Sequence, residues 1–339
     1  MRVFLTTIMT LCLLAGSYFH DKPAHADDLR FFKIASGSLG GTYYPIASSL
    51  AKVISNPPGS KSCEAGGNCG IPDLTATAQS SGGSVANVDS LLAKKYPSAI
   101  VQSDVTYWAY TGTGPFRTRK PNPGLCVITA LYPEDIHLVA SKQSGIRSLP
   151  EIAGKRVAMG ERNSGALLGA QLLVRAYGLE EGKNFTPSFV NFEGARNAMK
   201  AGEIDAFITV SGHPNKAIAE MIAGEGAQLV AITGAGTKRL TDGSPFYTAS
   251  RIPTGAYPGQ SGDIDTVAVT ALWIARTDLD QDFLYTLTKT FWENKHARTI
   301  LDGGHPKGES ITMATSFDGV PIPLCIGTQR YYKEIGRFK

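Results

Sequence analysis

Residues 31–54 read FFKIASGSLGGTYYPIASSLAKVI and place a strand, a loop and a helix in immediate succession. The apolar start is typical of a short strand, residues 36–41 form a glycine-rich loop, and residues 44–54 have the apolar spacing of a helix. Residues 74–95 and 156–177 repeat this order. Strands that alternate with helices form mostly parallel sheets, whose ligands bind at the carboxyl ends of the strands. We therefore expect the three loops to share one crevice.

Two short, mostly apolar runs, residues 136–141 and 266–275, separate regions that each have their own alternation of strands and helices. Such runs suit buried strands, and we expect them to cross between two domains. A chain of 339 residues is long enough for two domains. The sequence thus predicts an α/β protein of two lobes joined by a two-strand hinge. Residues 27–142 and 257–339 would form a discontinuous lobe 1, and residues 143–256 an inserted lobe 2.

Residues 1–26 have the features of a Sec signal peptide. Arg2 supplies the positive charge, an apolar run follows, and Ala24-His25-Ala26 matches the small-residue cleavage motif. The apolar run is too short to span a bilayer comfortably, and an uncleaved N-terminal anchor is the alternative interpretation. We therefore expect an exported protein that resides in the periplasm.

Cleavage after residue 26 would leave four cysteines in an oxidising compartment, where disulfides are the default. Cys63 and Cys69 flank a flexible segment that can close a small ring, which leaves Cys126 and Cys325 as a long-range pair. Other pairings are formally possible, and we favour this one. A zinc site is the alternative, but the sequence has no C-x-x-C and no histidine at ligand spacing, so we predict no metal.

Charge and motif content exclude several classes of function. The chain carries 33 Lys and Arg against 29 Asp and Glu, without a basic block or stripe, so we expect no nucleic-acid partner. Neither the P-loop motif nor the dinucleotide fingerprint GxGxxG occurs, which disfavours phosphate-rich cofactors, and we predict no cofactor. A serine hydrolase would need a motif such as GxSxG, which is also missing, so no catalytic residue is predicted.

The glycine loops indicate how a ligand would be held. A loop that opens a helix leaves backbone N–H groups without partners at the positive end of the helix dipole, which favours an anion such as a carboxylate. For a single loop, the alternative is that the glycines only permit a turn. Three such loops with polar side chains predict a shared crevice for a small polar ligand. The polar residues are Ser38, Thr42, Ser80, Ser81, Ser84, Asn163 and Ser164.

Several short segments along the chain carry a family resemblance. They are residues 37–45 (GSLGGTYYP), 81–87 (SGGSVAN), 102–105 (QSDV), 131–137 (LYPEDIH), 149–157, 163–165, 205–207, 212–214 and 253–259 (PTGAYPG). Together they span nearly the whole chain after residue 26. In this order they resemble the TAXI family of TRAP-transporter solute receptors, the immunogenic periplasmic protein type.

The resemblance implies a type II periplasmic solute-binding protein, in which two α/β lobes close on a small ligand, usually a carboxylate or an amino acid such as glutamate. Such a receptor delivers its ligand to a TRAP-type membrane permease driven by an ion gradient. We accordingly expect a monomeric binding protein and no enzyme. One alternative is an exported hydrolase or cyclohexadienyl-dehydratase-like lyase on the same scaffold, and another is a surface adhesion protein without a small ligand. The lack of a nucleophile motif favours the receptor.

By position, the resemblance also implies the residues of the ligand site. They are Ser38, Gly40, Gly41, Thr42, Tyr43, Ser84, Asn87, Gln102, Asp104, Ser164, Gly165 and His213. His213 has an alternative interpretation as a loop histidine with a structural role. Two positions depart from the family pattern, since Ala166 stands where threonine often follows Ser-Gly, and His213 stands where tyrosine is common. The resemblance therefore leaves the identity of the ligand open.

Overall fold

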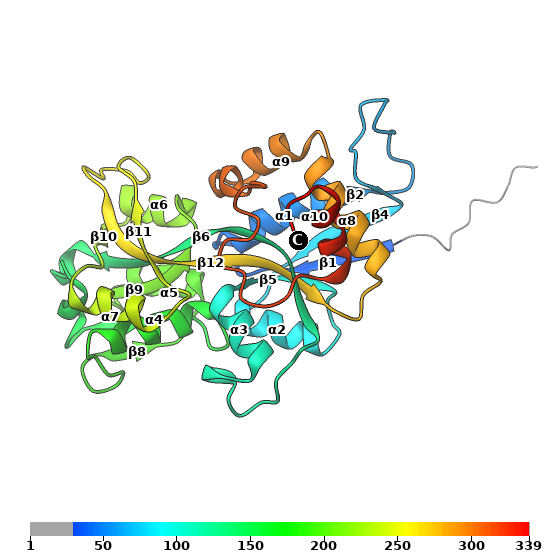
Figure 1. The fold of residues 1–339 in the computed structure, drawn as a ribbon. Coiled ribbons are helices and arrows are strands. Elements are labelled where there is room, and N and C mark those ends of the chain that lie inside the picture. Colours follow the sequence, from blue (N-terminus) through cyan, green and yellow to red (C-terminus); the bar gives the residue numbers. More distant parts are fainter. Residues whose placement is uncertain (1–29, 339) are drawn as a thin grey trace, which may run out of the picture.

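The computed structural model describes residues 30–338, so the predicted signal peptide lies outside the described residues. The chain forms two α/β halves side by side, linked by two long strands, β6 (Leu125–Ser141) and β12 (Ile264–Arg276) (Figure 1). We call residues 30–132 and 271–338 the first half and residues 136–269 the second half, after the hydrophobic cores to which they contribute. The prediction of two α/β lobes joined by two strands is confirmed.

The first half is assembled from both ends of the described chain. Its elements are β1 (Arg30–Ala35), α1 (Tyr43–Ile54), β2 (Ser55–Asn56), β3 (Ile71–Pro72), β4 (Leu74–Gln79), α2 (Ser84–Leu92), β5 (Ser98–Gln102), α3 (Ser103–Thr111), η2 (Gly114–Phe116), α8 (Gln281–Glu293), α9 (Ala297–Gly304), η5 (Pro306–Ser310) and α10 (Ile326–Glu334). The sheet follows the order β3-β2-β4-β1-β5-β12, and β1 pairs in parallel with both β4 and β5. Every residue of β5 is buried, as expected for a parallel strand that is covered on both faces.

The second half continues the same sheet in the order β12-β6-β9-β7-β8. Its elements are η3 (Lys142–Ser144), η4 (Leu149–Ile152), β7 (Arg156–Ala158), α4 (Gly165–Ala176), β8 (Thr186–Ser188), α5 (Phe192–Lys200), β9 (Ala206–Ser211), α6 (Lys216–Gly224), β10 (Ala227–Val230), α7 (Ala235–Gly243) and β11 (Thr248–Ile252). Strand β7 is parallel to β8 and β9, whereas β10 and β11 pair antiparallel with β6 and β12.

The three predicted units of strand, glycine loop and helix are confirmed as β1–α1, β4–α2 and β7–α4, and each helix begins one residue earlier than predicted. Because β1 and β4 are parallel neighbours, with Ala35 opposite Gln79, the first two loops leave the sheet at the same edge. They also contact each other, since the Ser81 N–H donates to the Gly37 carbonyl at 3.2 Å. The third loop belongs to the second half.

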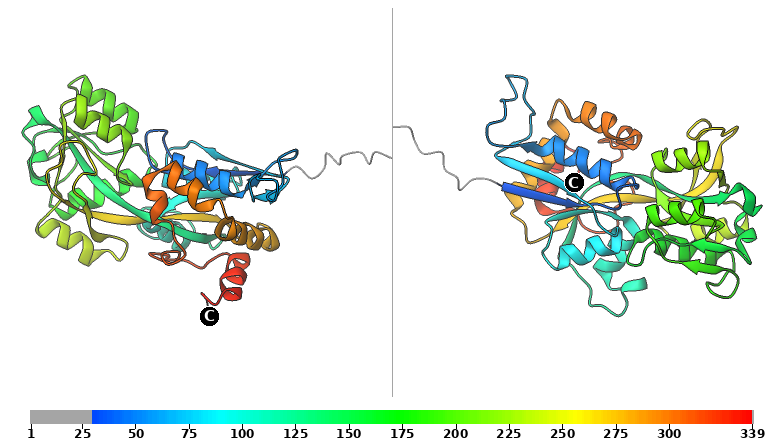
Figure 2. Two further views of the ribbon diagram at one scale, coloured as in Figure 1. Left: turned by 90° about the horizontal axis from the view of Figure 1, so that it is seen from above. Right: turned by 180° about the vertical axis from the view of Figure 1, so that it is seen from behind.

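Strands β6 and β12 carry the chain between the halves. They pair antiparallel from Ala268 opposite Asp135 to Arg276 opposite Leu125. In the first half β12 also pairs with β5, and in the second half β6 also pairs with β9. Both views in Figure 2 show the two halves joined along these strands. The predicted crossing runs lie within β6 and β12, while the lobe limits at residues 142 and 256 stay a prediction.

Separate hydrophobic cores stabilise the two halves. In the first half, Trp273 of β12 packs edge-on against Phe291 of α8, with ring centroids 5.6 Å apart. In the second half, Phe192 of α5 packs in the same way against Phe207 of β9 at 5.7 Å. Full burial of one such side chain contributes roughly 1.5–3 kcal/mol to the free energy of folding. The separate cores therefore stabilise each half independently.

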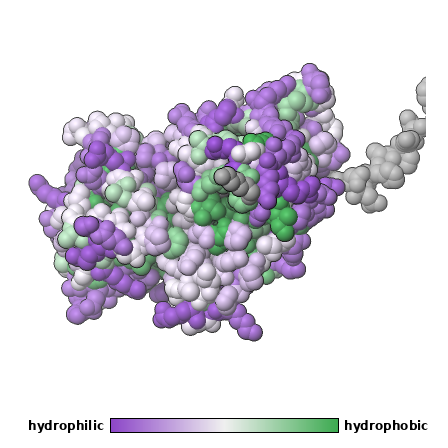
Figure 3. Space-filling model, viewed as in Figure 1, coloured by the Kyte–Doolittle hydropathy of each residue, from purple (hydrophilic) through white to green (hydrophobic). Residues whose placement is uncertain are grey.

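The surface seen in Figure 3 is largely polar, and hydrophobic residues gather beside the C-terminal segment. In and after α10, Ile326, Ile335 and Phe338 are exposed. Between residues 30 and 338, none of the helices combines the length and the apolar character that crossing a bilayer requires.

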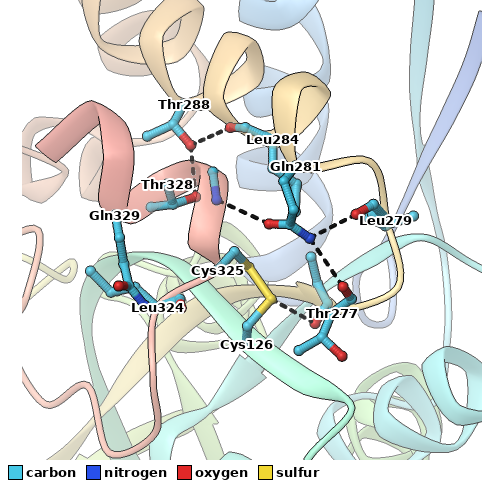
Figure 4. Close-up of a disulfide and its surroundings, with 12 residues drawn as sticks. Cys126, Thr277, Leu279, Gln281, Leu284, Thr288, Leu324, Cys325, Thr328 and Gln329 are labelled. Carbon is cyan, nitrogen blue, oxygen red and sulfur yellow. Dashed lines mark hydrogen bonds between the residues drawn. A yellow bond between two sulfur atoms is a disulfide. The ribbon is translucent and has the colours of Figure 1, made fainter.

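Two disulfides join the predicted pairs, Cys63 to Cys69 and Cys126 to Cys325. The second links β6 to the residue before α10, across a sequence separation of 199 residues (Figure 4). The backbone supports the same junction, because the Cys325 N–H donates to the Val127 carbonyl at 2.9 Å. The long-range disulfide therefore holds the C-terminal helix against the first half.

We predict that the two disulfides contribute unequally to stability. Under the loop-entropy relation, removing the long-range pair by C126A/C325A lowers the free energy of unfolding by roughly 5 kcal/mol, and C63A/C69A lowers it by roughly 2 kcal/mol. Denaturant unfolding of both double variants under oxidising conditions measures the difference. Equal losses in the two variants would contradict this expectation.

Candidate functional site

A cavity of about 100 Å³ lies between the two halves, next to the loops that follow β1, β4 and β7. This is room for several water molecules, each of which needs roughly 10–15 Å³ on the same measure. Eight of the predicted ligand residues line the cavity, namely Ser38, Gly41, Thr42, Tyr43, Ser84, Gln102, Ser164 and Gly165. The fold thus brings the three loops to one crevice, and their contact with a ligand stays a prediction.

Four other predicted residues do not line the cavity, namely Gly40, Asn87, Asp104 and His213. The buried Asn87 amide donates to the carbonyls of Ser36 and Ile100 at 2.6 and 2.8 Å, which fixes the first loop to β5. Asp104 is also buried, and it accepts a hydrogen bond from the Tyr247 hydroxyl of the second half at 2.8 Å. Burial raises the pKa of Asp104 to about 6. Both side chains therefore position the framework around the cavity.

Three helices begin at the cavity wall. Helix α1 starts directly after Thr42, α2 starts at Ser84, and α4 starts at Gly165. Ser164 caps α4, since its Oγ accepts a hydrogen bond from the Leu167 N–H at 3.0 Å, whereas no described side chain caps α1 or α2. The first N–H groups of a helix carry partial positive charge, which stabilises a nearby anion by about 0.3–1 kcal/mol. The cavity wall therefore suits a negatively charged group.

Direct contacts hold the two halves closed over the cavity. The hydroxyls of Thr42 and Ser211 share a hydrogen bond of 2.9 Å. The Gly40 N–H donates to Oε1 of Glu193 at 2.6 Å, so a carboxylate of the second half occupies one backbone donor of the first loop. The Gly40 N–H is thus bonded to the opposite half in this structure, and its contact with a ligand stays a prediction.

The two halves approach each other closely at Gly165. A Cβ atom at this position would lie 1.5 Å from Oε1 of Gln102 and 2.8 Å from Oγ of Ser84. Real Cβ atoms do not approach other heavy atoms so closely, so the start of α4 reaches β5 and α2 only because residue 165 lacks a side chain.

Glu134 is a buried carboxylic acid on the cavity wall, with only 2% of its surface exposed. Its Oε2 accepts a hydrogen bond from the Tyr43 hydroxyl at 2.7 Å. Burial raises the pKa of Glu134 well above its usual range, and the negative charges of Asp104 and Asp135 act in the same direction. In the described part of the chain, no lysine, arginine or histidine lines the cavity. The Glu134 carboxyl therefore has no cationic partner in the cavity.

Glu134 is not among the site residues predicted from the sequence, although it lies within segment 131–137, which carries part of the family resemblance. The available signal was an acidic residue that directly follows a long apolar stretch of a strand. Carboxylic acids are rarely buried without a partner, so an acid at such a position is a candidate for function.

A second polar cluster lies beside the cavity, around Asp135. The His213 Nδ1 is 2.5 Å from Oδ2 of Asp135, the Ser250 hydroxyl donates to Oδ1 at 2.6 Å, and the Lys307 ammonium lies 3.8 Å away. Burial raises the pKa of Asp135, but the hydrogen bond from His213 and the nearby positive charges outweigh burial and leave it below its usual range. His213 is thus bonded to Asp135, as its alternative interpretation expects, and its contact with a ligand stays an untested prediction.

Lys307 is not among the site residues predicted from the sequence. It lies in η5, far from Asp135 along the chain, and only the tertiary fold places the two side chains together. Burial lowers the pKa of Lys307. Across residues 30–338, no group of three or more histidine, cysteine, aspartate or glutamate side chains is arranged to hold a metal ion.

Comparison with known proteins places the chain within an established fold. The model of the NMT1-like family matches residues 34–336. Among solved structures, MatC from Rhodopseudomonas palustris with bound malate is similar at a TM-score of 0.52 and 14% identity, over 91% of this chain and 97% of that chain. The periplasmic binding protein BugD gives a TM-score of 0.50 and 12% identity, over 91% and 99%. The fold is therefore that of periplasmic binding proteins.

We predict that Gly165→Ala disturbs closure through one identifiable contact. The added methyl group would meet the Gln102 amide, so the variant should unfold at lower temperature, and Q102A in the same chain should restore part of the loss. Thermal unfolding of G165A, Q102A and the double variant measures the coupling. Gly224→Ala is a matched control, because a Cβ there meets nothing within 4 Å. Strictly additive effects of G165A and Q102A would contradict the assigned contact.

We also predict that Glu193→Ala weakens the closed arrangement. The variant loses the carboxylate that accepts the Gly40 N–H, so the two halves should separate more often and the radius of gyration of the free protein should rise. Small-angle X-ray scattering checks this expectation. E193Q keeps an acceptor oxygen, so its radius of gyration should lie between those of the wild-type protein and E193A. Glu203→Ala, at an exposed position, serves as the control. An unchanged radius in E193A would show that this contact does not hold the halves together.

Proposed function

The chain belongs to the NMT1-like family, and we propose on that premise that it is an extracytoplasmic solute receptor. It would bind a small carboxylate or amino acid between its two halves and deliver it to a membrane permease. The observation that carries the proposal is the cavity that lies between the halves and is bordered by three helix starts. Two halves between which the chain crosses on the paired strands β6 and β12 can open and close around such a cavity by a hinge motion.

The lining of the cavity supports binding rather than catalysis. Ser164 Oγ already caps α4, and Ser84 Oγ accepts the Gln102 N–H at 3.1 Å, so neither hydroxyl is paired with a base. A nucleophilic serine needs an adjacent general base, and no histidine or lysine lines the cavity in residues 30–338. Backbone donors and hydroxyl groups of this kind instead orient a ligand.

The ligand class, the type of permease and the location of the protein each have a separate basis. The ligand class rests on the helix starts, and MatC, which shares the fold, is described with bound malate, a small dicarboxylate. A TRAP-type permease driven by an ion gradient is proposed from the resemblance of segments such as residues 37–45 and 131–137 to the TAXI receptors. Residence in the periplasm is proposed from residues 1–26 and agrees with the two disulfides.

We expect small carboxylates to bind and to reduce the radius of gyration of the protein. Titration calorimetry with glutamate, 2-oxoglutarate, succinate and malate, beside the corresponding amides or esters, tests the charge requirement. Gly41→Val should weaken binding at least about tenfold, because a valine side chain on this part of the cavity wall would take up space that the proposed ligand needs. Gly224→Val, remote from the cavity, is the control. Equal affinity for neutral and anionic ligands, or no compaction on binding, would overturn the proposal.

A further inference from the structure

We propose that Glu134 binds a positively charged amino group of the ligand, so that the receptor selects zwitterionic amino compounds over plain carboxylates. This inference rests on the proposed function and assigns the chemistry of one end of the same cavity. Its basis is a pair of polar groups on the cavity wall, one acceptor and one donor, that the described residues leave incompletely bonded.

The acceptor is the carboxyl group of Glu134. The Tyr43 hydroxyl donates to Oε2, while Oε1 has no hydrogen-bond partner among residues 30–338. A carboxylate offers about four acceptor sites, so a single hydrogen bond leaves most of its capacity unused. Because Glu134 is almost fully buried and lines the cavity, a ligand is the partner positioned to complete its bonding.

The surrounding charges favour a cation at this position. Asp104 and Asp135 lie close enough to raise the pKa of Glu134, and Glu161 is a second carboxyl group on the cavity wall. The charge of Lys307 acts in the opposite sense, but its ammonium is directed to Asp135 and to Nε2 of His213, at 3.8 and 3.4 Å. The ionised form of Glu134 therefore has no positive charge from residues 30–338 beside it in the cavity, and a ligand ammonium would supply one.

The donor is the side-chain amide of Gln102, which is 2% exposed and lines the cavity. Its Nε2 has no hydrogen-bond partner. The starts of α2 and α4 add backbone donors on the same side, at Ser84 and Gly165. A ligand carboxylate would satisfy these donors while its ammonium contacts Glu134, which is the charge arrangement of an amino acid.

The test compares ligands that differ only in the amino group, namely L-glutamate with glutarate, L-aspartate with succinate, and L-alanine with propionate. Calorimetry on the wild-type protein should show at least about tenfold tighter binding of the amino compound in the pair that fits best, since a hydrogen bond to a charged buried group is of that order. Glu134→Gln keeps the shape and an acceptor for the Tyr43 hydroxyl and removes the charge. In E134Q this preference should fall to about threefold or less.

Glu180→Gln, an exposed carboxylate outside the cavity, is the matched control and should keep the wild-type preference. Should E134Q fail to fold, the wild-type comparison alone decides. Tighter or equal binding of the deaminated acids overturns this inference and leaves the proposed receptor function standing, as does an E134Q variant that keeps its preference. If none of the six compounds binds, the proposed function itself falls, and this inference falls with it.

Discussion

The antiparallel pairing of β6 with β12 is the constraint on which the rest of the structure depends. The two strands extend from one half into the other, so their hydrogen bonds keep the halves together while allowing the sheet to twist between them. The ladder shifts register between Ala271 and Leu272 and again between Trp273 and Ile274, and such irregularities bend a sheet locally. The cavity lies between the halves that these strands join, so its opening and its closure both depend on this junction.

Strand β6 directs the neighbouring side chains of Glu134 and Asp135 into different surroundings. Successive side chains point to opposite faces, so Glu134 lines the cavity while the carboxylate of Asp135 meets His213 and Ser250. One acid is thereby neutralised by protein groups, and the next is left with a single hydrogen bond from Tyr43. The different directions of their pKa shifts follow from these surroundings and not from the residue type.

Closure uses backbone donors for two purposes. The Gly40 N–H is occupied by Glu193 of the opposite half, whereas the starts of α2 and α4 border the cavity directly. A carboxylate of the protein thus stabilises the closed arrangement by the same physical interaction that would hold an anionic ligand. Gly165 permits the two helix starts to meet, because any side chain there would collide with Gln102.

The sequence by itself determined the local units, since apolar periodicity and glycine-rich loops are local properties that predicted β1–α1, β4–α2 and β7–α4 to within a residue at each helix start. Cysteine number and spacing likewise predicted both disulfides. Only the tertiary structure decided which polar residues face the cavity. Asn87 and His213 are bonded to the framework, while Glu134, Glu193 and Lys307 reach their places through contacts with residues distant in the chain. The direction and partners of a buried polar side chain depend on what packs against it, and no local pattern encodes that packing.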